Sequence, residues 1–173
     1  MSFLKKIFKK APSTEEEAKE KEVYLSLDDA FVHHFIEKGG KFLYCTSEEE
    51  VSKNLKYILQ ENGWNTLTHL NKNLKKYLKE KKVRMISEFD QSLPFFTTCE
   101  YLIADNGGVL FSSNQLSTHK LASLTDDFIV FATTSQLVRN TGQALTGIKS
   151  NCKNHIPTNI SACLLYTSDA ADD

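Results

Sequence analysis

The stretch that decides the fold is TTCEYLIADNGGVLFSSN, residues 97–114. It contains a strand-forming apolar segment at 101–104, a polar turn at 105–108 and a second strand-forming segment at 109–111. The paired glycines of the turn can adopt positive φ, and they let backbone N–H groups approach an anion without obstruction by a Cβ atom. Because Asn-Gly between two such segments also marks a hairpin, a plain hairpin and a ligand-binding loop both fit.

A second strand-forming segment with a polar end follows at 128–132. It leads into Thr133, Thr134 and Ser135, which we call the crest. A predicted helix follows, with Leu137, Leu145 and Ile148 on one face. In an open α/β sheet, ligands bind where strands end in polar residues at the start of a helix. The crest is therefore a candidate part of a binding site.

The first half of the chain alternates helical and strand-forming patterns. Helices are predicted from the apolar spacing over 31–36, 51–59 and 70–78, with a capping box at Ser47 and Glu50 opening the second. Strands are predicted at 42–44, within 64–70 and at 83–86. This alternation predicts an α/β domain with a mostly parallel sheet covered by helices on both faces.

The composition is that of one ordinary globular domain. The 173 residues are 40% hydrophobic and 25% charged, and the formal net charge is −1. A basic stretch at 72–84 is interpreted as the solvated face of a helix, because no aromatic or RNA-binding motif accompanies it. We therefore expect no nucleic-acid partner.

The N-terminus carries no secretory signal, and no apolar run approaches the ~20 residues that span a bilayer. A cytoplasmic location is the default expectation. Residues 1–10 could form one basic amphipathic turn that touches an anionic membrane weakly, although a loosely ordered solubilising arm fits better. Residues 1–24 as a whole are predicted to be a disordered arm and linker.

Metal and cofactor sites have no support in the spacing of cysteines and histidines. The four cysteines are scattered, with no C-x-x-C pair and no histidine at metal-ligand spacing, and none of the five histidines has triad or metal spacing. We therefore expect no metal and no cofactor bound by this chain. Cys45 and Cys99 are predicted to be small core residues.

The last residues, CLLYTSDAADD at 163–173, resemble a translated sequencing adapter. They include acids and small residues that are a poor ending for an α/β core. We therefore predict that 163–173 is a non-native tail, that the α/β domain is residues 25–162, and that the native protein continues beyond Ala162.

The order of segments from Lys41 to Ala162 resembles the LUD-domain (lactate utilisation) family, in its short single-domain subgroup. The likeness begins with the CEYLIA strand at 99–104, a tight turn at 105–108 and an apolar strand at 109–113. It continues with a second turn at 124–127 and with the strand, the crest and the start of the helix at 128–138. The resemblance implies the fold of the sugar-phosphate isomerase and CoA-transferase superfamily. It also implies a link to bacterial proteins that oxidise L-lactate to pyruvate beside iron–sulfur proteins.

Three departures from the family pattern bear on the site. Asp105-Asn106-Gly107-Gly108 stands where the family often has Glu-Thr-Gly-Thr. The Leu-Pro-Pro element is replaced by 124–127 without proline, and a C-terminal Gly-Pro-Ser-x-Thr motif has no counterpart. The catalytic residues are therefore unknown, and the candidate acids are Glu100 and Asp105, neither with a histidine nearby in sequence.

The predicted ligand-binding residues are expected to converge at the carboxyl ends of adjacent strands in one polar cleft. They are Asp105, Asn106, Gly107, Gly108, Ser112, Ser113, Asn114, Thr133, Thr134 and Ser135.

Three functions fit the sequence. The resemblance favours an accessory subunit of lactate utilisation in organic-acid metabolism, with iron–sulfur oxidoreductase subunits as partners and clusters only in those partners. The alternatives are a small enzyme acting on a phosphorylated or CoA-linked substrate, and a ligand-binding or regulatory module without chemistry.

Overall fold

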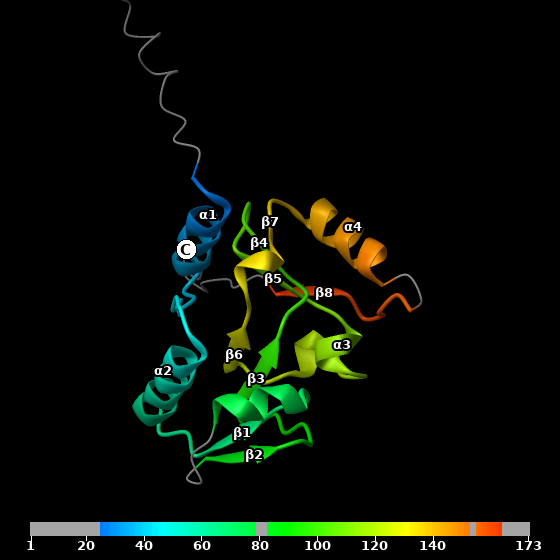
Figure 1. Ribbon diagram of the computed structural model, residues 1–173. Helices are drawn as coiled ribbons and strands as arrows, with labels where there is room; N and C mark the ends of the chain where they lie inside the picture. The colour runs from blue at the N-terminus through cyan, green and yellow to red at the C-terminus, as the bar shows by residue number, and fades with distance from the viewer. Residues whose placement is uncertain (1–24, 79–82, 153–154, 164–173) are drawn as a thin grey trace, which may run out of the picture.

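The computed structural model describes residues 25–78, 83–152 and 155–163. These residues form two four-stranded sheets with helices packed around them (Figure 1). The predicted arm at 1–24, the proposed membrane-touching turn within it, and residues 164–173 lie outside the described residues.

The first sheet has the order β2-β1-β3-β6, and all of its strands are parallel. Its strands are β1 (Thr66–Thr68), β2 (Arg84–Ile86), β3 (Phe95–Thr98) and β6 (Phe128–Phe131). Alternate residues of β3 face opposite layers, as the strand period requires. Phe96 packs with α2 (Glu48–Glu61) and the 3-10 helix η2 (Lys72–Tyr77), whereas Phe95 packs towards α3 (Ser113–Leu116) and η3 (Leu121–Ser123). The α/β class with a parallel sheet is thus confirmed.

The second sheet is mixed and has the order β7-β4-β5-β8. Its strands are β4 (Tyr101–Ile103), β5 (Gly108–Phe111), β7 (Leu137–Val138) and β8 (Ser161–Cys163). β4 and β5 pair antiparallel as a hairpin, with Ile103 opposite Gly108. The sequence pattern did not separate this sheet from the first, because β7 and β8 have only two and three residues.

Helices α1 (Leu27–Glu37) and α4 (Thr141–Asn151) cover opposite faces of the second sheet (Figure 1). Leu102 and Val109 pack with Phe31 of α1, while the neighbouring residues Ile103 and Leu110 pack with α4. This alternation fixes the register, because a shift by one residue would exchange the two faces. The hairpin is therefore held rigidly between two helices.

Several predicted elements differ in detail. Residues 42–44 form no strand, and Leu43 and Tyr44 are 57% and 63% exposed, so their β-forming side chains find no sheet to join. The pattern at 70–78 folds as the 3-10 helix η2 rather than an α-helix. Leu137 belongs to β7, because α4 begins only after its N-cap Asn140, whose side chain accepts a hydrogen bond from Gln143 N.

The end of the described chain bears on the predicted tail. Cys163, its first residue, lies opposite Val109 in β8 and packs against the core. The remainder of the tail falls outside the described residues, so its foreign origin stays a prediction.

Candidate functional site

Glu100 lies where the chain leaves the parallel sheet and enters the second one, between β3 and β4. Its backbone N–H donates to Leu110 O at 2.8 Å, which fixes the residue beside β5. One carboxylate oxygen, Oε1, accepts from Ser112 Oγ at 2.5 Å, Asn114 Nδ2 at 2.8 Å and Gln115 Nε2 at 3.2 Å. We call Glu100 with these three donors the Glu100 cluster.

The short helix α3 presents the three donors. Ser112 is its N-cap and forms a capping box with Gln115, since Ser112 N donates to Gln115 Oε1 at 2.9 Å. Ser112 and Gln115 are buried, whereas Asn114 is exposed. The local capping geometry therefore places a set of donors around the Glu100 carboxylate before any ligand arrives.

The crest lies beside the same cluster. β3 and β6 run parallel with Thr98 opposite Phe131, so the residues that follow both strands emerge at the same edge. Gln136, the residue after the crest, links the two strand ends, because its Nε2 donates to Cys99 O at 2.5 Å and to Glu100 O at 3.3 Å. Thr133 Oγ1 and Ser135 Oγ lie 2.7 Å apart, and both residues are exposed.

The sequence did not single out Gln115 and Gln136, although a signal for both was present. Each glutamine stands three residues after a hydroxyl residue, Ser112 or Thr133, which is capping-box spacing. In both cases the structure shows the reciprocal box. The side chains of Gln115 and Gln136 also donate hydrogen bonds to Glu100, so the two capping boxes contribute residues to the site in addition to stabilising their turns.

The turn at 105–108 does not join this edge, which corrects the prediction of one convergent cleft. In the antiparallel hairpin it lies at the end where Ile103 pairs with Gly108, whereas Glu100 and Ser112 lie beyond the opposite end, where Tyr101 pairs with Leu110. There the turn packs on α1: Lys38 Nζ donates to Asn106 O at 2.6 Å, and His34 Nδ1 lies 2.8 Å from Ala104 O.

The glycines of this turn serve packing rather than an open anion cradle. Gly107 has φ +63°, and a Cβ atom there would lie 2.6 Å from Phe35 N, so only glycine lets α1 approach. The N–H of Gly108 already donates to Asn106 Oδ1 at 2.8 Å. Both glycines are buried, so the expected exposure of their N–H groups to an anion is not what the structure shows. Asp105 itself is exposed.

Cys99, next to Glu100, behaves as predicted for a core residue. It is 3% exposed, and burial, with a smaller effect of the Glu100 charge, raises its pKa to about 12. A thiol with so high a pKa is a poor nucleophile or metal ligand at neutral pH. Cys45 is only half-buried, so it does not lie inside the core as predicted.

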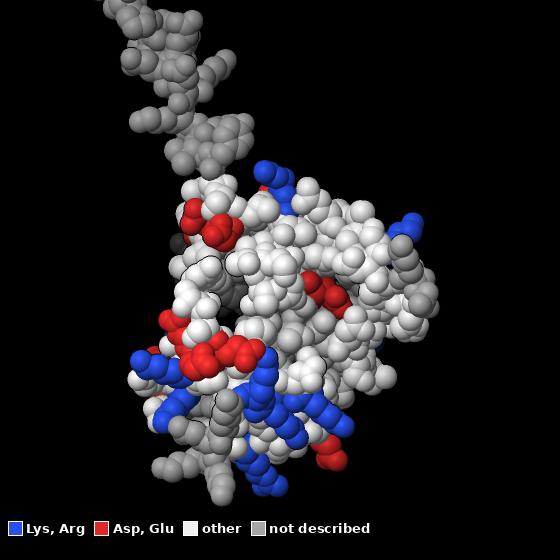
Figure 2. Space-filling view, viewed as in Figure 1, with Lys and Arg blue, Asp and Glu red and all other residues white. Residues whose placement is uncertain are grey.

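Charged side chains lie in several parts of the surface shown in Figure 2, and the largest group surrounds α2 and η2. Figure 2 shows basic and acidic side chains gathered together around α2 and η2, where Lys76 pairs with Glu48, and that hydrogen bond raises the pKa of Lys76. One acidic spot lies in otherwise uncharged surface between α3 and α4, the area where Figure 1 places the β3–β4 connection (Figure 2). The mixture of signs around η2 agrees with the interpretation of a solvated face for residues 72–78, and residues 79–82 of the basic stretch lie outside the described residues.

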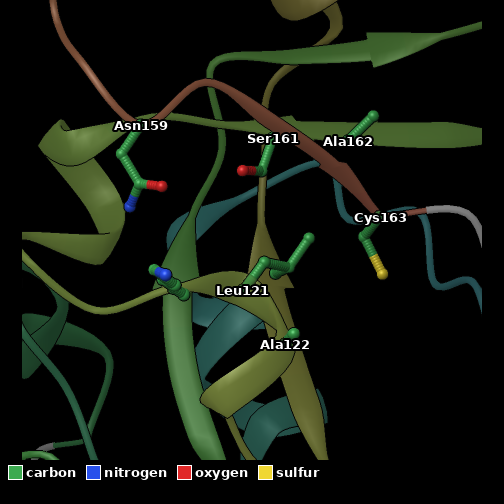
Figure 3. A pocket seen from close by; sticks show the side chains of 7 residues that line it. Leu121, Ala122, Asn159, Ser161, Ala162 and Cys163 are labelled. Atoms are coloured by element: carbon green, nitrogen blue, oxygen red, sulfur yellow. The ribbon is translucent and has the colours of Figure 1, made fainter.

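A hollow of about 580 Å³ lies beside the edge strand β8 (Figure 3). Leu121 and Ala122 of η3 form one side, and Asn159 with Ser161–Cys163 forms the other. It is mainly apolar, and none of the predicted site residues lines it. It is therefore separate from the Glu100 cluster.

The fold and this site define an α/β protein with a polar edge at the carboxyl ends of parallel strands. A family model described as LUD domain matches residues 29–170, and the chain belongs to the LUD domain family, which is related to lactate utilisation. No curated protein and no solved structure matches it. Within the described residues, no helix is long and apolar enough to cross a membrane.

Proposed function

We propose that this protein is a cytoplasmic accessory subunit of lactate utilisation, which takes part in the oxidation of L-lactate to pyruvate beside iron–sulfur partner proteins. The observation that carries the proposal is the LUD domain match over residues 29–170. The Glu100 cluster supports it, because it offers the acceptor and donors that a small hydroxy acid needs.

The charge of Glu100 sets how lactate would bind. Lactate has a carboxylate and a neighbouring hydroxyl, and two carboxylates in contact repel each other. The hydroxyl end would therefore face Glu100, whose Oε2 accepts none of the three hydrogen bonds made to Oε1. The exposed Asn114 amide and the hydroxyls of Thr133 and Ser135 would donate to the substrate carboxylate.

The oxidation removes two electrons and two protons from lactate. In this proposal Glu100 accepts the hydroxyl proton, and the electrons with the remaining proton pass to the partner proteins. This chain supplies binding, orientation and the proton acceptor, and the electron carriers belong to its partners. A phosphorylated or CoA-linked substrate would bring more negative charge to the same carboxylate, so the cluster favours the hydroxy acid.

Genetic complementation tests the proposed role. A bacterial host that grows on L-lactate should lose this growth, but keep growth on glucose, when its own LUD-domain gene is deleted. The gene for this protein should restore growth on L-lactate. Pull-down of the tagged protein from lactate-grown cells should enrich iron–sulfur proteins over a strain with the tag alone. Failure of the gene for this protein to restore growth on L-lactate would contradict the proposal.

A further inference from the structure

Three side chains with metal-binding groups lie together on α1, away from the Glu100 cluster. A ring nitrogen of His33, a ring nitrogen of His34 and a carboxylate oxygen of Glu37 all lie within 4.8 Å of one another. Cysteine and histidine spacing predicts no metal site here. The cluster depends instead on a helix turn, which places residues four apart on one face.

His33 and Glu37 form the exposed half of the cluster. His33 Nε2 lies 3.2 Å from Glu37 Oε1, with side chains 56% and 58% exposed. A tetrahedral metal with bonds of about 2.0–2.2 Å holds its ligand atoms roughly 3.3–3.6 Å apart, so this pair is close to the required separation. The same contact would serve as a surface ion pair if His33 were protonated, and an exposed pair of that kind adds little stability.

His34 forms the half-buried part of the cluster, and its ring is oriented by the hairpin. Its Nδ1 lies 2.8 Å from Ala104 O, an acceptor, so in the neutral imidazole Nδ1 carries the proton and Nε2 the lone pair. Metal-ligating histidines are commonly held in this way, because a backbone carbonyl on one ring nitrogen fixes the tautomer of the other. The hairpin therefore fixes the orientation of the His34 ring, one nitrogen of which lies within 4.8 Å of the ligand atoms of His33 and Glu37.

We propose that His33, His34 and Glu37 bind one Zn²⁺ ion at the junction of α1 with the β4–β5 hairpin. Two imidazoles and a carboxylate suit zinc among the divalent cations, whereas Mg²⁺ and Ca²⁺ prefer all-oxygen sites. Three protein ligands leave at least one position open to water, and the exposure of His33 and Glu37 places that position on the surface. The site stands independently of the proposed function.

Titration calorimetry of the complete chain with zinc chloride tests the site. We expect one Zn²⁺ ion per chain, with binding at least about tenfold weaker in His33→Ala and in Glu37→Gln. Both positions are exposed, so these variants should keep the circular dichroism spectrum of the original protein. The matched controls are His155→Ala and Glu49→Gln, which change exposed residues outside the cluster and should bind zinc unchanged.

Cobalt absorption separates this cluster from the cysteines. Co²⁺ bound by two histidines and a carboxylate should give visible d–d bands without the intense near-ultraviolet band of a thiolate ligand. Equal zinc affinity in the original protein, His33→Ala and Glu37→Gln would overturn the proposal. A thiolate band that survives His33→Ala would overturn it too, by placing the metal on a cysteine.

Discussion

At the scale of single residues, two glycines share a backbone conformation but not an environment. Gly63 and Gly107 have φ +68° and +63°. A Cβ atom on Gly63 would meet nothing within 4 Å, whereas on Gly107 it would collide with the backbone of α1. A side chain at Gly63 would therefore cause backbone strain alone, whereas a side chain at Gly107 would cause backbone strain and a collision with α1.

We expect Gly63→Ala to lower the free energy of unfolding by about 1 kcal/mol, the cost of a left-handed alanine. Gly107→Ala should cost at least about 3 kcal/mol, because α1 must also move away from the hairpin. Urea denaturation followed by circular dichroism measures both. Equal losses in the two variants would show that α1 does not press on the turn as the structure has it.

His69 gives the stability a dependence on pH. It follows β1 with a fully buried side chain whose Nδ1 lies 3.1 Å from Asn71 O, and burial lowers its pKa, with a smaller contribution from the charge of Lys75. Below about pH 6.5 the unfolded chain then binds a proton that the folded chain does not, so stability falls as the pH falls.

We therefore expect His69→Gln to reduce the loss of unfolding free energy between pH 7.5 and pH 5.5, whatever it does to stability at pH 7.5. Urea denaturation at a series of pH values measures the two slopes. His155→Ala, an exposed histidine in the same chain, is the control and should leave the slope unchanged. An unchanged slope in His69→Gln would contradict the burial of this imidazole.

At the scale of elements, the sequence predicted what depends on local pattern. The helix at 31–36, the capped helix opened by Ser47 and the strands at 101–104, 109–111 and 128–132 are confirmed within a residue or a few. It left the segments at 101–104 and 109–111 open between a plain hairpin and a ligand-binding loop, and it did not predict that they belong to a second sheet. The connection between β4 and β5 is too short for a parallel crossover, so β5 runs antiparallel to β4. The packing of α1 and α4 on opposite faces, a tertiary contact, then fixes which residues face each helix.

The candidate site was likewise predictable only in the parts that depend on local sequence pattern. The Ser112–Asn114 segment contacts the Glu100 carboxylate, and the crest is linked to Glu100 through the next residue, Gln136, which donates to the Glu100 carbonyl oxygen. The turn at 105–108 does not, since an antiparallel hairpin sends its turn away from the ends of its strands. Whether any of these residues binds a ligand stays a prediction.

The edge strand β8 gives a prediction about where the folded unit ends. It pairs with β5 through Ser161, Ala162 and Cys163. A chain that ends at residue 160 should lose about 2 kcal/mol of stability, which lowers the melting temperature by roughly 4–8 °C. A chain that ends at Cys163 should keep the melting temperature of the full chain, because residues 164–173 are predicted to be foreign.

Calorimetry on the three chains decides between these outcomes. The family match extends to residue 170, so the expectation that residues 164–173 can be removed without loss of stability can be contradicted directly. A large loss of stability on removal of 164–173 would mean that this segment belongs to the domain. An unchanged melting temperature for the chain ending at residue 160 would mean that β8 is dispensable.

At the scale of the whole molecule, two sheets meet at the point where β3 passes into β4, and Glu100 stands at that point. Ser112 at the start of α3 and Gln136 after the crest contact Glu100 from separate parts of the chain. The central claim is that this carboxylate serves lactate oxidation. Glu100→Gln is the sharpest change, because the amide oxygen can still accept from Ser112 while the second oxygen, the proposed acceptor, is lost.

The measurement that tests this most directly is L-lactate-dependent dye reduction in extracts of a host lacking its own LUD-domain gene, complemented with each variant. We predict that Glu100→Gln lowers the rate at least about tenfold without loss of soluble protein. Glu61→Gln, an exposed residue at the end of α2, should leave the rate unchanged. A Glu100→Gln rate equal to that of the original protein would contradict the claim.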